Sequence, residues 1–267
     1  MKKHLPNLIL IGVFLLGLSL LLYPTVSNWW NSFHQSRAVS TYTEIVATVN
    51  NEDYDELWDK AIEHNQTLAI KGNNWRLTEE EQHEYERLLK LEHTDVMGYI
   101  EIPKIKCMLP IYHGTDEAVL QAGVGHIEGT SLPTGGLNTH CVISGHRGLP
   151  SAKLFSNLDQ LKEGDSFKLK VLDEVLNYEV DQIRIVLPDE IQDLKIVEGE
   201  DYCTLVTCTP YGVNSHRLLV RGKRVEGEEV TIRVSADAVQ IEPILVAPAV
   251  AVPILFVLLN NCYIQPI

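Results

Sequence analysis

The central part of the chain lacks any cluster of lysine and arginine. Its 22 Lys and Arg residues stand against 36 Asp and Glu residues, giving a formal net charge of −14 over 267 residues. Binding to a phosphate backbone requires a basic stripe or patch. We therefore expect no nucleic-acid partner, and we interpret the acidic surface as one that keeps the domain in solution.

Paired cysteines are also missing. The chain has five cysteines, an odd number, with no C-x-x-C motif and no Cys/His pair at metal-ligand spacing: Cys107, Cys141, Cys203, Cys208 and Cys262. These patterns disfavour a disulfide framework and a zinc site, and we expect neither a metal nor another cofactor. Since a lone cysteine is usually a small buried hydrophobic residue, a reactive one has to be identified from its neighbours.

An uncharged run lies near the N-terminus. Residues 5–23 form a stretch of 19 residues without charge, close to the ~20 needed to cross a bilayer. Lys2 and Lys3 before it, and a tryptophan pair after it, predict a cytoplasmic N-terminus at residues 1–4 and an external body. A cleaved signal peptide is the alternative, although no tidy A-x-A site follows the run.

The C-terminal segment is also uncharged, from residue 243 to residue 267. A second membrane segment over residues 243–264 is one interpretation. Pro248 and Pro253 would interrupt a helix there, so an interfacial or disordered tail is the alternative.

Helical periodicity follows the first apolar run. From Tyr54, apolar residues recur at i, i+3, i+4, i+7 and i+8. Thr78 and Glu81 form a capping box before a second helical pattern. We predict a mostly helical extension over residues 24–94, with an irregular loop at residues 65–77.

Short β-rich runs replace the helical pattern from residue 95 onward. Gly, Pro and Asp separate them, at a spacing typical of an all-β sandwich or barrel. The runs lie at 97–102, 106–112, 139–145, 166–171, 175–187, 203–208 and 217–221. We predict an all-β catalytic domain over residues 95–235, with one short helix near residues 152–159.

One of these runs ends on Cys208, just before a Thr-Pro-Tyr-Gly break. A side chain at a strand end beside a loop is held rigidly and is accessible to a substrate. Arg217 begins another run nine residues later, so a hairpin would bring it near Cys208. There its guanidinium could stabilise an oxyanion or hold a thiolate. Taken singly, each residue is more often structural, as a core cysteine or a surface arginine.

A histidine occupies the same kind of position. His146 follows another β run that ends in glycine, and its imidazole could serve as general acid and base. His126, His140 and His216 compete for this role, and each alone is more often a hydrogen-bonded structural residue. His140 shares strand parity with His146 and is the strongest rival.

Three segments of the β region resemble the sortase family of cysteine transpeptidases. Residues 204–222, which contain Thr-Cys-Thr-Pro-Tyr-Gly, resemble the family's cysteine signature. Residues 142–158, which contain Gly-His-Arg-Gly-Leu-Pro, resemble its histidine segment, and residues 123–136 resemble the stretch before it. The resemblance covers residues 95–225 and implies a closed eight-stranded β-barrel with short helices, preceded here by the helical extension.

The resemblance also implies a two-step acyl transfer. The Cys208 thiolate would attack the Thr–Gly carbonyl of an LPXTG-like sorting signal, and an amine would then resolve the acyl-enzyme. His146 would act as general acid and base, and Arg217 would stabilise the oxyanion. Thr207, immediately before the cysteine, would contact the substrate.

Three features resemble the class C, pilin-polymerising sortases: the wording around the cysteine, the long extension and the apolar C-terminus. This resemblance implies pilins or surface proteins with LPXTG-like signals as partners, and a pilin lysine as the acceptor amine. A housekeeping sortase, which joins surface proteins to a peptidoglycan amine, is the alternative within the family. In both cases we expect membrane anchoring with the catalytic domain on the extracellular face.

Class C enzymes usually carry an Asp-Pro-aromatic lid in the extension, and this tripeptide is absent here. Asn74-Trp75 is the nearest candidate, with Trp75 as the plug and Asn74 in place of the acid. The alternative is that Trp75 simply packs against the barrel or the helices.

Two functions outside the transpeptidases also fit some of these residues. A membrane-tethered cysteine peptidase would use the same cysteine and histidine but let water resolve the acyl-enzyme. Papain-like enzymes usually have the histidine after the cysteine, whereas His146 precedes Cys208. A non-catalytic surface module, in which the cysteine is incidental, is the other alternative.

Overall fold

The computed structural model describes residues 5–226, so the expected second membrane segment at residues 243–264 lies outside it. Contacts divide the chain into two units. Among the described residues, one unit holds those up to Asn31 with the short stretch Pro150–Ala152, and the other holds Ser32–Leu149 and residues 153–226.

Helix α1 (Leu5–Val46) is long and apolar enough to cross a membrane, judged by length and composition. The mean hydropathy of its most apolar window is 2.3, and none of that window is buried. The segment that we predict to cross the membrane spans residues 5–23, and α1 continues beyond it through Pro24. In a long helix one proline removes a single backbone hydrogen bond, and the turns on either side are retained.

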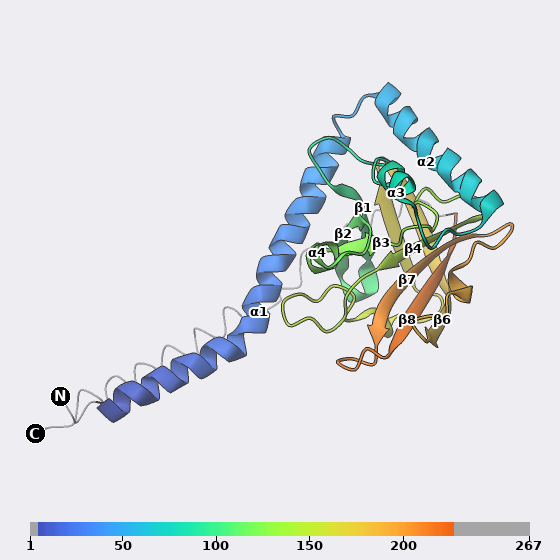
Figure 1. Cartoon of the computed structure of the whole chain (residues 1–267). Coiled ribbons are helices and arrows are strands. Elements are labelled where there is room, and N and C mark those ends of the chain that lie inside the picture. Colours follow the sequence, from blue (N-terminus) through green and yellow to red (C-terminus); the bar gives the residue numbers. More distant parts are fainter. Residues whose placement is uncertain (1–4, 227–267) are drawn as a thin grey trace, which may run out of the picture. The chain divides into compact units, whose positions relative to one another are not determined.

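Eight strands close into a barrel in the order β1-β2-β3-β4-β7-β8-β6-β5, which confirms the predicted closed eight-stranded barrel (Figure 1). Two neighbouring pairs are parallel, β2 with β3 and β4 with β7, and the others are antiparallel. The strands are β1 (Val96–Ile102), β2 (Cys107–His113), β3 (Val124–His126), β4 (Thr139–Ser144), β5 (Ser166–Val171), β6 (Glu174–Val186), β7 (Asp201–Thr209) and β8 (His216–Arg224).

Tight packing fills the barrel. Phe167 stacks on Tyr178, with ring centroids 5.5 Å apart, and both side chains are fully buried. Gly222 of β8 lies directly beneath them, since a Cβ at this position would come within 2.6 Å of the Phe167 ring. Cys141 and Cys203 are register partners in β4 and β7 and are also buried.

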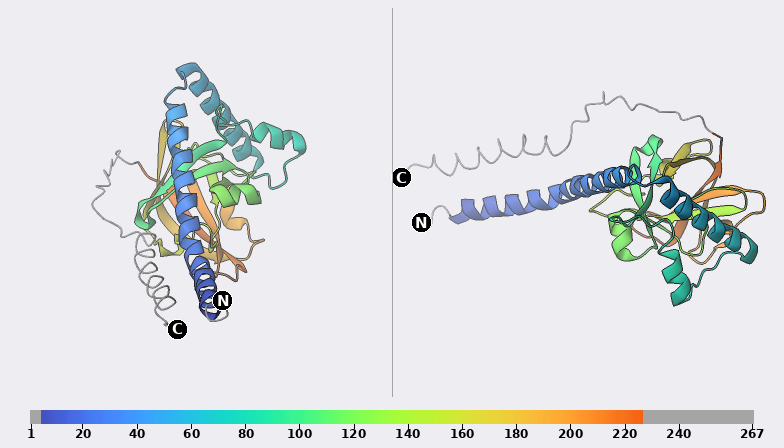
Figure 2. Two further views of the ribbon diagram at one scale, coloured as in Figure 1. Left: turned by 90° about the vertical axis from the view of Figure 1, so that its left-hand side faces the viewer. Right: turned by 90° about the horizontal axis from the view of Figure 1, so that it is seen from above.

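Helices α2 (Asn51–Lys71) and α3 (Glu79–Tyr85) lie outside the barrel (Figures 1 and 2). The capping box predicted at Thr78 and Glu81 is confirmed. The irregular loop is shorter than predicted, because α2 continues to Lys71 and ends at Gly72, whose φ of +82° suits glycine.

A buried asparagine, Asn65, lies on the side of α2 that faces the barrel. The Asn65 amide donates to the Leu132 carbonyl and the Thr134 hydroxyl, and it accepts from the Leu132 N–H. These bonds tie α2 to the barrel. The last helical part of α1 is attached similarly, since the Tyr42 hydroxyl donates to Met97 O and accepts from Leu172 N.

Short helices occupy the connections. They are η1 (Pro103–Ile105), α4 (Glu117–Ala122), η2 (Leu158–Gln160) and η3 (Gln192–Leu194). The helix predicted near residues 152–159 is reduced to turns and η2, where the chain satisfies its carbonyls through i→i+3 bonds such as Leu161 N to Leu158 O.

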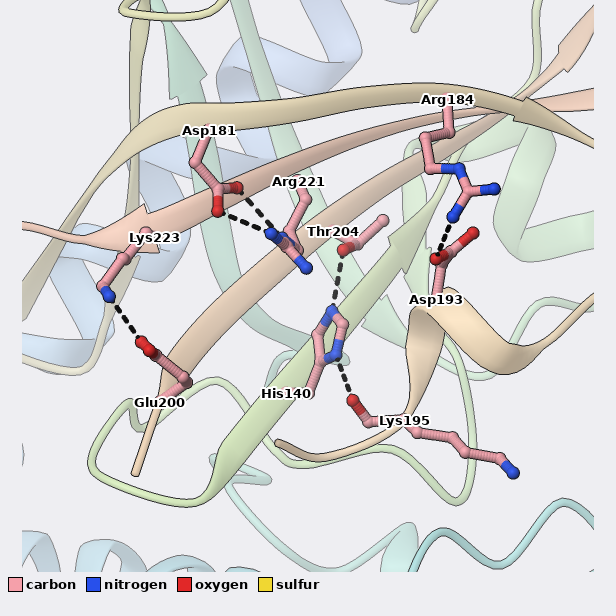
Figure 3. A network of polar contacts seen from close by, with 9 residues as sticks. All are labelled: His140, Asp181, Arg184, Asp193, Lys195, Glu200, Thr204, Arg221 and Lys223. Atoms are coloured by element: carbon pink, nitrogen blue, oxygen red, sulfur yellow. Dashed lines mark hydrogen bonds and ion pairs between the residues drawn. The ribbon is translucent and has the colours of Figure 1, made fainter. Parts of the chain in front are cut away.

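His140 anchors the connection between β6 and β7 (Figure 3). One ring nitrogen lies 2.7 Å from the Thr204 hydroxyl, and the other lies 2.8 Å from the carbonyl of Lys195 in that connection. Ion pairs Arg184–Asp193, Arg221–Asp181 and Lys223–Glu200 surround it. Burial lowers the pKa of His140 to about 4, so the imidazole stays neutral at physiological pH.

We expect the free energy of unfolding to decrease as the pH falls from about 6.5 to about 4. In this window the unfolded chain takes up a proton that the folded His140 excludes, whereas above it the full stability is present. At pH 5, His140 should account for about 1 to 2 kcal/mol. Burial lowers the pKa of His113 to about 4 as well, so His140→Gln should remove only part of the effect.

Urea unfolding of the full chain in detergent at pH 7 and pH 5 would measure this difference. His83→Gln is the matched control, because the His83 side chain is 76% exposed on α3. If the two variants lose stability equally between pH 7 and pH 5, His140 does not carry the pH dependence.

Candidate active site

The β7–β8 hairpin pairs the candidate nucleophile with the candidate arginine. Cys208 and Arg217 are register partners in these antiparallel strands, so their side chains share one face of the sheet. Within β7, Cys208 is partly exposed while every other residue is buried. The predicted hairpin is therefore present, and the cysteine lies where the strand meets the loop.

Among the cysteines of residues 5–226, the environment favours Cys208 as a nucleophile. Cys141 and Cys203 are buried in the barrel. Burial raises the pKa of the Cys107 thiol to about 12, so it stays protonated. Cys208 is partly exposed and is the register partner of Arg217, so its thiol is accessible to a substrate at the strand end.

The loop after Cys208 holds the arginine in place. Arg217 Nη1 donates to the carbonyls of Asn214 and His216, at 3.2 and 3.1 Å. Asn214 has a φ of +59°, a left-handed conformation that asparagine tolerates, and its N–H donates to Pro210 O. The turn thus fixes one edge of the guanidinium and leaves its other N–H groups for a substrate.

Parallel pairing brings the histidine to the same edge. Ser144 of β4 pairs with Val206 of β7. His146 lies two residues after Ser144, and Cys208 lies two residues after Val206. Parallel strands end at the same edge of a sheet. A backbone bond from Gly145 N to Val206 O, at 3.0 Å, continues the pairing past the strand end. The structure therefore brings all three predicted residues to one end of the β4–β7–β8 sheet.

The other histidines have structural contacts. His126 is fully buried, with its ring nitrogens 2.9 Å from the Tyr85 hydroxyl and 2.8 Å from Ser131 O. His140, the rival by strand parity, is bonded at both ring nitrogens as described above. His216 contacts the Ser215 hydroxyl.

Thr207 differs from the expected substrate contact. It is 2% exposed, and its hydroxyl donates to the Gly145 carbonyl at 2.7 Å. Adjacent residues of a strand point to opposite faces, so Thr207 faces away from the side on which Cys208 lies. Its contact supports the backbone immediately before His146.

Arg147 was not singled out by the sequence, yet it joins the histidine segment to the cysteine strand. Its side chain is 9% exposed, forms an ion pair with Asp159 and donates to the Thr209 hydroxyl at 3.5 Å. The Tyr211 ring covers Gly148 on the same loop. These contacts link the residues that follow His146 with those that follow Cys208.

Comparison with known proteins accounts for this arrangement. A profile of the sortase domain matches residues 100–225. Sortase D of Bacillus subtilis is 33% identical over 139 residues, which cover 51% of this chain and 67% of that protein. The crystal structure of sortase C1 from Streptococcus agalactiae is 52% identical, with a TM-score of 0.70, over 72% of this chain and all of that one.

The chain belongs to the sortase family. Sortases are cysteine transpeptidases. A further similar structure is Clostridium perfringens sortase C with the C-terminal cell wall sorting motif, at 46% identity and a TM-score of 0.64. It matches 72% of this chain and all of that one.

In this sortase, Trp75 packs on an apolar cluster beside the site. The cluster lies on the outer side of the sheet and consists of Val142, Val186, Leu194, Val206 and Leu219. Val206 lies two positions before Cys208 in β7, and Leu219 lies two positions after Arg217 in β8. Alternate residues of a strand point to the same face, so Val206 and Leu219 share the face of Cys208 and Arg217. Trp75 therefore lies on the face of the sheet that carries the predicted nucleophile.

Hydrogen bonds from Asn73 and Asn74 attach the loop that carries Trp75 to two connections of the barrel. Asn74 N donates to Gly129 O at 3.2 Å, and the Asn73 amide bridges Gly129 O and Ile196 N. The Asn74 side chain instead contacts Glu81 and the N–H of Arg76, on the α3 side of the loop. Of the two lid candidates, only Trp75 is placed against the cluster.

We found no group of three or more His, Cys, Asp or Glu side chains that could hold a metal ion within residues 5–226.

A thiol reagent should label Cys208 much faster than the buried cysteines, because alkylation requires an accessible thiolate. The test uses iodoacetamide on the full chain in detergent. All proteins carry Cys262→Ser, so that labelling reports on Cys107, Cys141, Cys203 and Cys208 alone. Mass spectrometry of peptides after short exposure gives the rate for each site. Cys208→Ala should abolish rapid labelling, and equal labelling of Cys107 would contradict the assignment.

Proposed function

We propose that this sortase cleaves an LPXTG-like sorting signal between Thr and Gly and transfers the acyl group to an amine. The convergence of Cys208, Arg217 and His146 at one end of the β4–β7–β8 sheet carries the proposal. The similar Clostridium perfringens sortase C with a sorting motif supports this substrate class.

In the first half-reaction the Cys208 thiolate attacks the carbonyl carbon of the Thr residue. The oxyanion that forms receives hydrogen bonds from the free edge of the Arg217 guanidinium. His146 gives its proton to the departing glycine amine as the C–N bond breaks. The products are a thioester on Cys208 and a neutral amine.

In the second half-reaction an amine attacks the thioester. His146 takes a proton from this amine, the C–S bond breaks, and the thiolate of Cys208 leaves. An amide replaces the thioester, so no oxidant or external energy source is needed. A peptidase would instead use water at this step.

A pilin lysine is the acceptor that we propose, as in class C sortases. The high identity to sortase C1 of Streptococcus agalactiae supports this class. So do the wording around the cysteine and the long helical extension. A housekeeping role with a peptidoglycan amine is the second candidate, because the same three residues serve either amine.

We also propose that α1 anchors the enzyme in the cell membrane with the catalytic domain outside. The apolar character of α1 supports an anchor, and Lys2 and Lys3 at its start favour a cytoplasmic N-terminus.

The full chain, incubated with its candidate pilin, should produce high-mass covalent ladders. Cys208→Ala and His146→Ala should abolish them, because neither variant can form and resolve the thioester. Arg217→Lys should reduce the rate by about 100-fold, since a single ammonium does not replace the guanidinium fork. A pilin without its acceptor lysine is the matched control.

Other products would identify the other candidates. Adducts to a peptidoglycan-type amine without ladders would favour the housekeeping role. Hydrolysis alone, with no adduct to any amine, would show that the protein is a peptidase.

We propose that residues 72–78 form a lid that Trp75 holds over the site. Trp75→Ala should raise cleavage of a sorting-signal peptide by about 3- to 10-fold, as expected if the open form is otherwise a minor population. Trp58→Ala is the matched control, because Trp58 stacks on Tyr54 within α2 and lies outside the loop. Equal rates for wild type and Trp75→Ala would exclude a plug.

A further inference from the structure

Glu117, at the start of α4, approaches the predicted general acid. Its Oε2 lies 3.5 Å from His146 Nε2. The two residues come from different elements and are separated by 28 intervening positions. Neither the cysteine signature nor the histidine segment contains this glutamate.

The ring nitrogen that faces Glu117 has no hydrogen bond. His146 Nε2 is buried and makes none within the described chain, although the side chain as a whole is 26% exposed. A buried polar atom without a partner is unfavourable, so this nitrogen favours an acceptor or donor beside it. The 3.5 Å separation is longer than the ~2.7–2.9 Å of a charge-assisted bond, so a small shift of the carboxylate would complete it.

The carboxylate is held in this orientation. Gln121, one helical turn away, donates to the other oxygen, Glu117 Oε1, at 2.8 Å. This bond and the nearby His146 keep the pKa of the Glu117 carboxyl below its usual value. The carboxylate is therefore ionised under the conditions in which His146 exchanges protons.

The helix that carries Glu117 is itself attached to α1. The buried Gln35 amide donates to the carbonyl of Ala122, the last residue of α4, at 3.2 Å. Gly123 N also bonds back to Val119 O and closes the helix end. A six-residue helix has few bonds of its own, so these contacts fix its position.

Other charged groups near the site already have partners. Arg147, next to His146, is paired with Asp159. Arg217 donates to the carbonyls of its own turn. Within residues 5–226, Glu117 is thus the acidic side chain that forms an ion pair with this imidazole.

We propose that Glu117 is a positioning residue that orients the His146 ring and holds a proton on its Nε2. With Nε2–H directed at Glu117, Nδ1 is the ring nitrogen that exchanges protons with the departing and incoming amines. The carboxylate stays ionised throughout and takes up no proton. The inference rests on the proposed function, because it assigns a supporting role to the proposed general acid and base.

The tautomer of the His146 ring is the direct readout. In the full chain in detergent, with Cys208→Ala to prevent turnover and ¹³C-labelled histidine, NMR would measure its ring-carbon shifts. The His146 signal is identified by its loss in His146→Gln. Glu117→Gln should reduce the share of the tautomer with the proton on Nε2, because Nε2–H loses its carboxylate acceptor.

Turnover is the second readout, with an internally quenched LPETG peptide as the probe. Glu117→Gln should reduce kcat by about 3- to 10-fold, since a misoriented imidazole is a poorer proton donor and acceptor. The KM should stay within about twofold, because Glu117 contacts the His146 ring rather than the bound peptide. Glu117→Asp keeps the carboxylate and should retain part of the Nε2–H tautomer.

Asp116→Asn is the matched control. It removes the same charge one position earlier, and the Asp116 side chain makes no capping bond to α4. Equal effects of Asp116→Asn and Glu117→Gln on the His146 tautomer would overturn the inference. If instead His146→Ala itself retained activity, the proposed function would fail, so the two failures are distinguishable.

Discussion

Parallel pairing of β4 with β7 is the constraint on which the site depends. Ser144 of β4 and Val206 of β7 are register partners. His146 lies two positions after Ser144, and Cys208 lies two positions after Val206, so both reach the same end of the sheet. An antiparallel pairing would have put His146 and Cys208 at opposite ends of their strands. A slip of one residue would have turned one of the two side chains to the wrong face.

Several contacts maintain this edge beyond the last ladder bond. Thr207 supports the carbonyl before His146 from the far face of β7. Arg147 joins the loop after the histidine to Thr209. Neighbours without a proposed chemical role therefore fix the positions of His146 and Cys208. A rigid site usually requires such supporting residues.

Burial then selects among chemically identical side chains. Cys141 and Cys203 fill the barrel, and Cys107 is held protonated by desolvation. His140 shares strand parity with His146, but both of its ring nitrogens have structural partners. One contacts the Lys195 carbonyl in the β6–β7 connection, and the other contacts the Thr204 hydroxyl in β7. Within residues 5–226, Cys208 and His146 at the strand ends combine support from the sheet with partial exposure.

Asparagine amides connect the helical extension to the barrel. The buried Asn65 amide bonds to Leu132 and Thr134, and the partly buried Asn73 amide bridges two barrel connections. A polar residue in a helical pattern, such as Asn65, would ordinarily be assigned to solvent. Here each amide has partners, so it attaches the extension without leaving an unsatisfied group, and the bonds of Asn73 hold the loop that carries Trp75.

The sequence by itself determined an all-β domain, the helices before it and three candidate residues at strand ends, because strand spacing, capping and strand-end placement are local signals. Spacing left a sandwich or a barrel open, and the resemblance to sortases implied the closed barrel and the roles of the three residues. The sequence did not determine how far α2 extends, which way Thr207 points or where Trp75 packs. It also did not single out Arg147 or Glu117. Those features depend on contacts between residues distant in the chain, such as Glu117 with His146, and only the closed barrel brings such residues together.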